Sequence, residues 1–255
     1  MNKKALFAAT ILDNPYIPHD PTKRQAEFLL RDEGEVFYGG AAGGGKSDAL
    51  LMAALQYVLF PDYSALLLRR TYKDLALPGA LMDRASEWLS GTDARWNHQD
   101  KVWSFPSGAT LTFGYLDNEN DKYRYQGAEF QFVGFDELTQ FSQTQYAYLH
   151  SRTRRLMGSD IPIRVMSASN PGGIGHEWVK ARFIEGPGAF VPALLDDNPH
   201  LDRESYECAL AKLDPVTREQ LRHGNWDIGI RGELFDRTWF PMADGPFPEG
   251  ARRVR

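Results

Sequence analysis

A glycine-rich segment has the residue types and the spacing that bind the phosphates of a nucleotide. Residues 40–47 read GAAGGGKS and match the pattern G-x-x-x-x-G-K-S/T, known as Walker A. We expect Lys46 to bridge the β- and γ-phosphates of ATP and Ser47 to bind Mg²⁺. Glycines let backbone N–H groups turn toward phosphate oxygens. The glycines expected to do so are Gly40, Gly43, Gly44 and Gly45.

A pair of acidic residues supplies the second half of this chemistry. Residues 132–137 read FVGFDE, an apolar strand that ends in Asp136 and Glu137. A carboxylate at the end of a buried strand can bind Mg²⁺ at the C-terminal edge of a parallel sheet, which is the Walker B role expected of Asp136. Glu137 is then placed to polarise a water for attack on the γ-phosphate. The pair favours ATP hydrolysis over phosphate transfer to a small molecule.

Two amide side chains are candidates for further contacts to the nucleotide. Gln25, in the sequence PTKRQ at 21–25, can both donate to and accept from the adenine edge. A surface glutamine at the start of a helix explains that residue equally well. Asn170, in the sequence SASNP at 167–171, is expected near the γ-phosphate at the tip of a strand, where it would report hydrolysis. An ordinary strand-to-loop turn is the alternative there.

Arginines are harder to place. ATP hydrolysis is commonly accelerated by an arginine that neutralises charge in the transition state, supplied in cis or by a neighbouring subunit. The Walker A segment contains no arginine, and Arg124, in the sequence YRYQG before the Walker B strand, is our first candidate for this catalytic role. An ion pair or a solvated surface position is the alternative. The other candidates are Arg152, Arg154 and Arg155.

Composition narrows the class of protein. The chain has 255 residues, and 29 Lys and Arg against 34 Asp and Glu give a net charge of −5. A coat that binds nucleic acid non-specifically would be basic overall, so any DNA contact must come from a local basic patch, with Arg69, Arg70 and Lys73 as candidates. The single cysteine, Cys208, excludes an internal disulfide. No apolar run approaches the roughly 18 residues of a membrane span, so we expect a soluble protein without a membrane partner.

The elements that must position these residues alternate along the chain. Short apolar runs at 35–38, 65–68, 131–135 and 163–167 predict buried parallel strands, and between them lie helical segments at 47–60, 80–89 and 142–156. The last of these helices begins with a capping box, Ser142 with Gln145. Alternating residues around 106–109 predict a β-hairpin of 102–105 with 110–113. The prediction is an α/β protein with a mainly parallel central sheet.

The chain divides into three parts on this interpretation. We expect a P-loop ATPase core over residues 1–185 and a small linker subdomain over 186–240, with two short helices near 203–213 and 215–223. Residues 241–255 are rich in Pro and Gly and are interpreted as a linker tail.

Taken together, these residues resemble the N-terminal ATPase domain of the terminase large subunit of tailed bacteriophages. The Walker motifs are generic, but their combination with the SNP tip at 169–171 and the downstream GNWD at 224–227 and GELF at 232–235 is similar to this family. The resemblance implies a P-loop fold of the ASCE, RecA-like type. It also implies an ATP-driven motor that packages viral double-stranded DNA into a procapsid in the host cytoplasm. The partners implied are the portal protein, the small terminase subunit and further copies of the chain in a ring, a pentamer on the portal.

Two features qualify what the resemblance implies. The family's motor is followed by a metal-dependent nuclease with its own acidic cluster, whereas residues 241–255 resemble a linker, so we expect no nuclease activity in this chain. The missing Walker A arginine disfavours a cis arginine from the P-loop and favours one from a neighbour, such as Arg124.

Two other functions stay open. One is a helicase or remodelling ATPase, although about 80 residues after Pro171 are few for a second motor lobe, and the other is a nucleotide-binding assembly module that does not hydrolyse ATP.

Overall fold

The central feature of the molecule is a mostly parallel sheet. In the computed structural model, the described residues are 3–155, 157–159, 161–199 and 201–228. Within them the strands form one sheet of eight in the order β3-β4-β5-β2-β6-β7-β1-β8. Neighbours from β5 to β8 run parallel, whereas β3-β4-β5 is an antiparallel meander at one end. The strands are β1 (Glu35–Gly40), β2 (Ser64–Arg69), β3 (Arg95–Asn97), β4 (Val102–Ser104), β5 (Thr110–Tyr115), β6 (Phe132–Asp136), β7 (Arg164–Ser169) and β8 (Ala189–Ala193).

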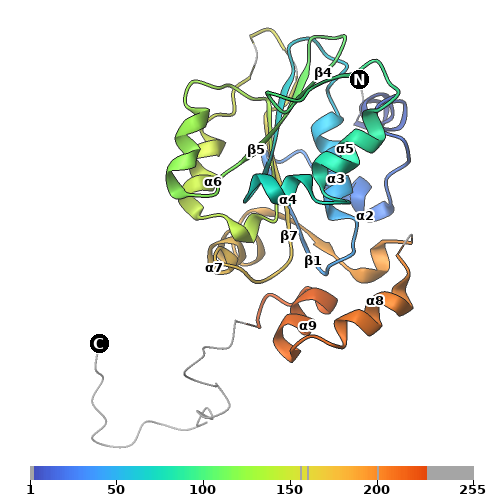
Figure 1. Cartoon of the computed structure of the whole chain (residues 1–255), viewed down its shortest axis with the longest axis vertical. Coiled ribbons are helices and arrows are strands. Elements are labelled where there is room, and N and C mark those ends of the chain that lie inside the picture. The colour runs from blue at the N-terminus through green and yellow to red at the C-terminus, as the bar shows by residue number, and fades with distance from the viewer. Residues whose placement is uncertain (1–2, 156, 160, 200, 229–255) are drawn as a thin grey trace, which may run out of the picture.

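Helices cover both faces of this sheet, so its central strands are buried (Figure 1). One face carries α2 (Lys23–Leu29), α3 (Lys46–Leu55), α4 (Tyr72–Ala76) and α5 (Leu81–Leu89), and the other carries α6 (Gln143–His150) and α7 (His176–Val179). A strand covered on both sides needs apolar residues at every position, which is why β2 reads ALLL and β6 reads FVGF. The predicted α/β architecture is confirmed.

The strand order decides where the motifs meet. β7 lies between β1 and β6, and the register pairs Gly39 with Ser169 and Asp136 with Ala168. Because these three strands are parallel, their carboxyl ends share one edge of the sheet. The loop after β1 is the glycine-rich segment, and the turn after β6 contains Glu137. Segments about ninety positions apart in the sequence therefore lie at the same edge.

Smaller elements surround the sheet. The N-terminal segment forms α1 (Lys3–Phe7) and the π-helical turn η1 (Ala8–Leu12). After the sheet, α8 (Arg203–Leu210) and α9 (Pro215–His223) form a pair of helices beyond the carboxyl edge (Figure 1). The backbone of α9 contacts the glycine-rich loop, because Ala42 N donates to Leu221 O at 2.7 Å. The remaining turns are η2 (Glu119–Tyr125), η3 (Leu138–Gln140), η4 (Lys180–Ile184) and η5 (Leu195–Asp197).

The local predictions differ from the structure mainly at their ends. The hairpin of β4 and β5 forms, with Val102 opposite Thr112, and the capping box of Ser142 with Gln145 is present. The helices after the Walker A segment and after Ser142 end at Leu55 and His150, sooner than residues 60 and 156. No helix among the described residues is both long and apolar enough to cross a membrane.

One strand extends the sheet beyond the predicted end of the core. β8 pairs with β1 at an edge of the sheet, so the sheet continues past residue 185. Pro192 disguises this strand in the sequence, since proline lacks the N–H of an interior strand and is tolerated at an edge. The division into a core and a small subdomain remains a prediction. The predicted tail, 241–255, lies outside the described residues.

Candidate functional site

A cavity of about 580 Å³ opens at the carboxyl edge of the sheet. Its walls come from the glycine-rich loop, the start of α2, the start of α3, α5 and the turns after β6 and β7. Four of the predicted phosphate contacts line it, together with the predicted Mg²⁺ ligand Ser47 and with Gln25, Glu137 and Asn170; Asp136, the second predicted Mg²⁺ ligand, is not in the lining. The four are Gly43, Gly44, Gly45 and Lys46. Gly40 does not line the cavity; it ends β1, where a Cβ would meet Ala193 O at 2.4 Å.

The glycine-rich loop is shaped by residues in left-handed backbone conformations. Gly43 has φ +76° and Gly45 has φ +72°, values that glycine adopts without the steric cost that a Cβ would impose. The buried Lys46 Nζ donates to Ala41 O of the same loop at 2.5 Å. Burial lowers the pKa of the Lys46 ammonium to about 8, although Glu137 and Asp136 oppose that shift. The lysine is thus a desolvated cation whose charge is available to an incoming phosphate.

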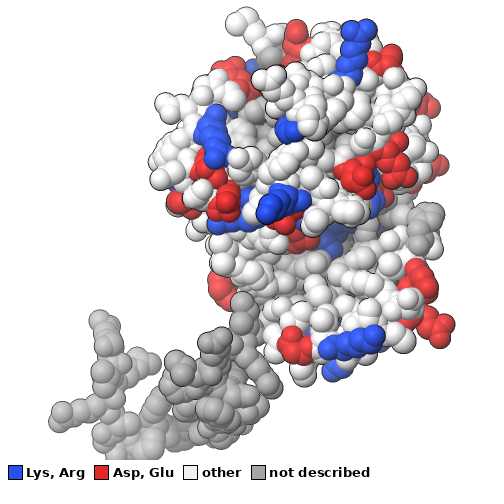
Figure 2. Space-filling model, in the orientation of Figure 1, with Lys and Arg blue, Asp and Glu red and all other residues white. Residues whose placement is uncertain are grey.

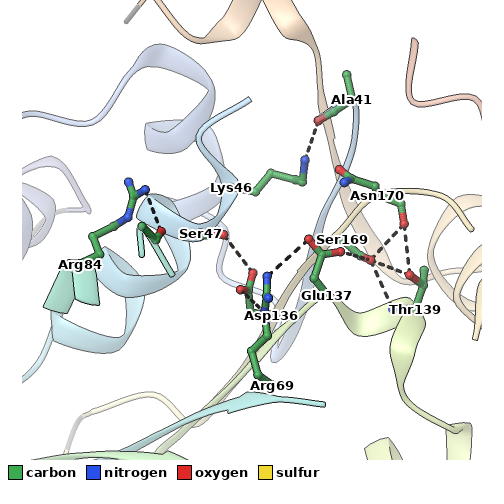
Figure 3. A network of polar contacts seen from close by, with 11 residues as sticks. Ala41, Lys46, Ser47, Arg69, Arg84, Asp136, Glu137, Thr139, Ser169 and Asn170 are labelled. Atoms are coloured by element: carbon green, nitrogen blue, oxygen red, sulfur yellow. Dashed lines mark hydrogen bonds and ion pairs between the residues drawn. The ribbon is translucent and has the colours of Figure 1, made fainter. Parts of the chain in front are cut away.

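Ser47 and Asp136 meet as the two motifs require (Figure 3). Ser47 Oγ donates to Asp136 Oδ1 at 3.1 Å, while Arg69 Nε donates to Asp136 Oδ2 at 2.8 Å. Two hard oxygen donors side by side at a phosphate site fit Mg²⁺, which keeps most of its waters and uses few protein ligands when it is bound with nucleotide phosphates. No cluster of three or more His, Cys, Asp or Glu suited to a metal occurs in the described part of the chain.

Glu137 is held in a strained turn directly after β6. It is one of the non-glycine residues with positive φ, at φ 57° and ψ 57°, a conformation that is uncommon for a glutamate and that clusters at functional sites. Its Oε2 accepts from Ser169 Oγ at 3.2 Å and its Oε1 lies 3.7 Å from Arg69 Nη2. Burial and the neighbouring Asp136 raise the pKa of Glu137, against the opposing charges of Lys46 and Arg69. A carboxylate with a raised pKa at a cavity wall suits a general base.

A hydroxyl network links Glu137 to the tip of β7. Thr139 Oγ1 lies 2.8 Å from Ser169 Oγ, and Thr139 N also donates to that oxygen at 3.3 Å. The Asn170 carbonyl lies 3.3 Å from Thr139 Oγ1 and 3.0 Å from Ser169 Oγ, so it competes with Glu137 for the single proton of the Ser169 hydroxyl. The side-chain Oδ1 of Asn170 is buried without a hydrogen-bond partner in the described structure (Figure 3). An amide with unused hydrogen-bonding capacity at the cavity is free to bind a ligand. No motif in the sequence points to Thr139, because a threonine three residues after a strand matches no functional pattern.

Gln25 lies at the cavity, but its amide already has two partners. Its Oε1 accepts from Thr22 N at 2.8 Å, which completes a capping box at the start of α2. Its Nε2 donates to Gly45 O at 2.9 Å. Gln25 therefore ties α2 to the glycine-rich loop. Its role as an adenine reader stays a prediction, with one Nε2 hydrogen left for a base.

The four candidate arginines do not line the cavity. Arg124 is half-exposed, pairs with Asp121 at 2.9 Å and lies over the ring of Tyr115. A contribution from these arginines to this copy's own cavity therefore lacks support, and a contribution to a neighbour's cavity stays a prediction. Two other arginines do reach the site. Arg69 contacts both acidic residues, and Arg84 lines the cavity wall.

A protein-family model matches most of the chain. The model of the family described as "Terminase large subunit, T4likevirus-type, N-terminal" matches residues 37–242. The chain belongs to this family. No curated protein matches the chain. The family match covers the glycine-rich loop, the acidic pair and α8–α9.

Solved structures of phage terminases share the fold at low sequence identity. The large terminase of a thermophilic bacteriophage superposes with a TM-score of 0.66 at 18% identity, covering 86% of this chain and 57% of that one. The large terminase of bacteriophage HK97 gives 0.64 at 12%, covering 88% and 55%. The large terminase ATPase domain of Thermus phage P74-26 gives 0.51 at 15%, covering 81% and 94%. The terminase chain thus spans little more than half the length of the first two.

Proposed function

We propose that this terminase chain is an ATP-hydrolysing motor that drives viral double-stranded DNA into a procapsid. The observation that supports it most is the 3.1 Å contact between Ser47 Oγ and Asp136 Oδ1, because it joins the two halves of a Walker site from segments far apart in the sequence. The adjacent cavity, of about 580 Å³, is large enough for a nucleoside triphosphate, and its wall includes Lys46, whose ammonium can bind phosphate. The large terminase of the thermophilic bacteriophage has been solved with ADP and with ATP-gamma-S, which supports nucleotide binding here.

The proposed reaction divides among the residues of the cavity. Lys46 and the N–H groups of the glycine-rich loop bind the phosphates. Ser47 and Asp136 would hold Mg²⁺, which would supply positive charge to the phosphates. Glu137 accepts a proton from the attacking water while the water oxygen forms a bond to the γ-phosphorus. The bond between the γ-phosphorus and the oxygen that bridges to the β-phosphate breaks, which leaves ADP and phosphate. Asn170 Nδ2 donates to the γ-phosphate, or the unpartnered Oδ1 accepts from the attacking water.

The role of Glu137 is tested by replacement with glutamine. Glu137→Gln keeps the size of the side chain and one acceptor oxygen but cannot take a proton. We expect ATP-gamma-S binding within about twofold of wild type and a loss of turnover of roughly 100-fold or more, the usual contribution of a general base. Binding is measured by titration calorimetry and turnover by phosphate release. Unchanged turnover would remove Glu137 from the chemistry and favour a nucleotide-binding module that does not hydrolyse ATP.

The arginine from a neighbouring subunit is tested by protein concentration. If Arg124 completes the cavity of a second copy in a ring, specific ATPase activity rises steeply with concentration, and Arg124→Ala abolishes the rise. Arg182→Ala is a matched control outside the four candidates, since Arg182 is also partly exposed, pairs with Glu35 at 2.8 Å and lies over an aromatic ring, that of Tyr146. A flat dependence in an active wild type would count against a shared site. An equal loss in both variants would count against Arg124.

The DNA surface is the least defined part of the proposal. Figure 2 shows basic and acidic side chains interspersed on the face drawn, with no continuous basic surface. Of the three basic residues considered for DNA, Arg69 is ion-paired at the cavity and Arg70 donates to Gln145 Oε1 at 3.3 Å. Binding to DNA phosphates releases counterions, so we expect affinity to fall steeply between 50 and 200 mM salt. Binding of the portal protein and the small subunit belongs to the same proposal.

A further inference from the structure

Arg84 presents a guanidinium to the cavity that no motif accounts for. It belongs to α5, pairs with Asp48 through Nη1 and donates from Nη2 to Gly79 O at 3.2 Å. Its Nε is buried and has no hydrogen-bond partner in the described part of the chain. Arg84 is the one arginine among the described residues that line the cavity. Its hydrogen-bonding capacity is therefore not fully used by the protein.

The position of Asp48, the ion-pair partner of Arg84, indicates which end of the cavity Arg84 faces. Asp48 directly follows Ser47 in the first turn of α3, and His19 Nε2 lies 3.5 Å from its other carboxylate oxygen. Glu137 and Asn170 line the cavity from the ends of β6 and β7, and Figure 3 shows them on the opposite side of Lys46 from Arg84. Hydrolysis is assigned to the Glu137 end under the proposed function. Arg84 therefore faces the part of a nucleotide that lies away from the γ-phosphate.

We propose that Arg84 binds the α-phosphate of the nucleotide in cis, exchanging the Asp48 carboxylate for a phosphate oxygen. This inference rests on the proposed function, since it concerns the same nucleotide. A guanidinium binds phosphate as it binds carboxylate, through two parallel N–H donors, so the exchange costs little. Asp48 holds the guanidinium at the wall and competes with the nucleotide for it. Arg84 is thus a binding residue common to ATP and ADP, distinct from an arginine that neutralises charge at the γ-phosphate.

This position predicts a specific pattern of affinities. Both ATP and ADP contain the α-phosphate, so Arg84→Gln weakens ATP-gamma-S and ADP by the same factor. We expect about tenfold for each, or about 1.4 kcal/mol, the lower range for a hydrogen bond to a charged group. Asp48→Asn removes the competing carboxylate, so its affinity for both nucleotides equals or exceeds that of wild type. Arg84→Lys keeps the charge and recovers part of the loss.

The experiment is titration calorimetry of ATP-gamma-S and ADP with wild type and each variant, after circular dichroism shows that the variants are folded. Arg31→Gln is the matched control, because Arg31 is equally exposed, pairs with Glu27 and Glu33, and also has an unpartnered Nε, but lies outside the cavity. Arg31→Gln should leave both affinities unchanged.

Three results would overturn the inference. If Arg84→Gln and Asp48→Asn weaken binding equally, the pair only supports the fold of α3. If Arg84→Gln weakens ATP-gamma-S far more than ADP, the guanidinium serves the γ-phosphate. If Arg84→Gln binds both nucleotides like wild type, Arg84 does not contact them. A wild-type protein that binds neither nucleotide refutes the proposed function itself, which separates that failure from the failure of this inference.

Discussion

Arg69 is the residue whose replacement should disturb the acidic pair most. It ends β2 and reaches Asp136 Oδ2 at 2.8 Å and Glu137 Oε1 at 3.7 Å. Removing one partner of a buried ion pair costs about 3–5 kcal/mol, because the other charge is left buried and uncompensated. Asp136 is only 3% exposed, but Arg69 is 18% exposed, so some water reaches the pair. We therefore expect Arg69→Gln to lower the free energy of unfolding by about 3 kcal/mol, the low end of that range.

The same replacement should shift the pH dependence of hydrolysis. The pKa of Glu137 is already raised by burial and by Asp136, and Arg69 opposes that rise. Without Arg69 the pKa of Glu137 rises further. A general base works only when ionised, so activity is lost as the pH falls through this pKa. The acid limb of the pH–rate profile should therefore lie at a higher pH in Arg69→Gln than in wild type.

The assay combines urea unfolding with single-turnover ATP hydrolysis between pH 5 and 9. Arg69→Lys is the control variant, because it restores one positive charge without the second contact, and it should lie between wild type and Arg69→Gln in both measurements. The destabilisation should also shrink at low pH, because protonation of Glu137 relieves the uncompensated charge. An acid limb at the same pH in wild type and Arg69→Gln would refute the electrostatic role of Arg69, even if the protein is destabilised.

Two further predictions concern the glycine-rich loop. Because burial lowers the pKa of Lys46 to about 8, and phosphates bind its protonated form, affinity for ATP-gamma-S should fall as the pH rises above 8. It should be about tenfold weaker at pH 9 than on the acidic plateau, since roughly one molecule in ten is then protonated, and pH-independent calorimetric affinities would contradict this. Gly45→Ala places a Cβ in a left-handed position 2.8 Å from Gln25 Nε2, so it should destabilise the protein by about 1–2 kcal/mol and weaken nucleotide binding. A thermal melt like that of wild type would argue against the strain.

The parts of the candidate site that could be predicted from the sequence are those made of consecutive residues. The glycine-rich loop depends on eight successive residues, and Asp136 and Glu137 follow directly after an apolar run. One general rule, that parallel strands end at the same edge of a sheet, then brings the two segments together. The structure places Ser47 and Asp136 in contact, as that rule requires. The α/β class followed from the same alternation of apolar runs and helices.

Side chains that reach the site through tertiary packing could not be found in this way. Arg84 lies 36 positions after Asp48, its partner, and reaches it only because α5 packs beside α3 on one face of the sheet (Figure 1). In the sequence, Arg69 is indistinguishable from any basic residue at the end of a buried strand; only the sheet order, which places β2 next to β6, brings it to Asp136. Neither contact has a spacing in the sequence that a motif could record.

Arg69 and Arg84 supply positive charge to different parts of the candidate site. Lys46 and Arg84 line the cavity from the loop and from α5, where the phosphates are proposed to bind, whereas Arg69 contacts the carboxylates at the end of the sheet. An arginine in the Walker A segment would place its cation at the phosphates directly. This chain lacks one, and the guanidinium that lines the cavity comes instead from α5, which follows β2 in the chain. If Arg84 and an arginine from a neighbour act at opposite ends of the nucleotide, as proposed, replacing both should produce additive losses in binding and turnover.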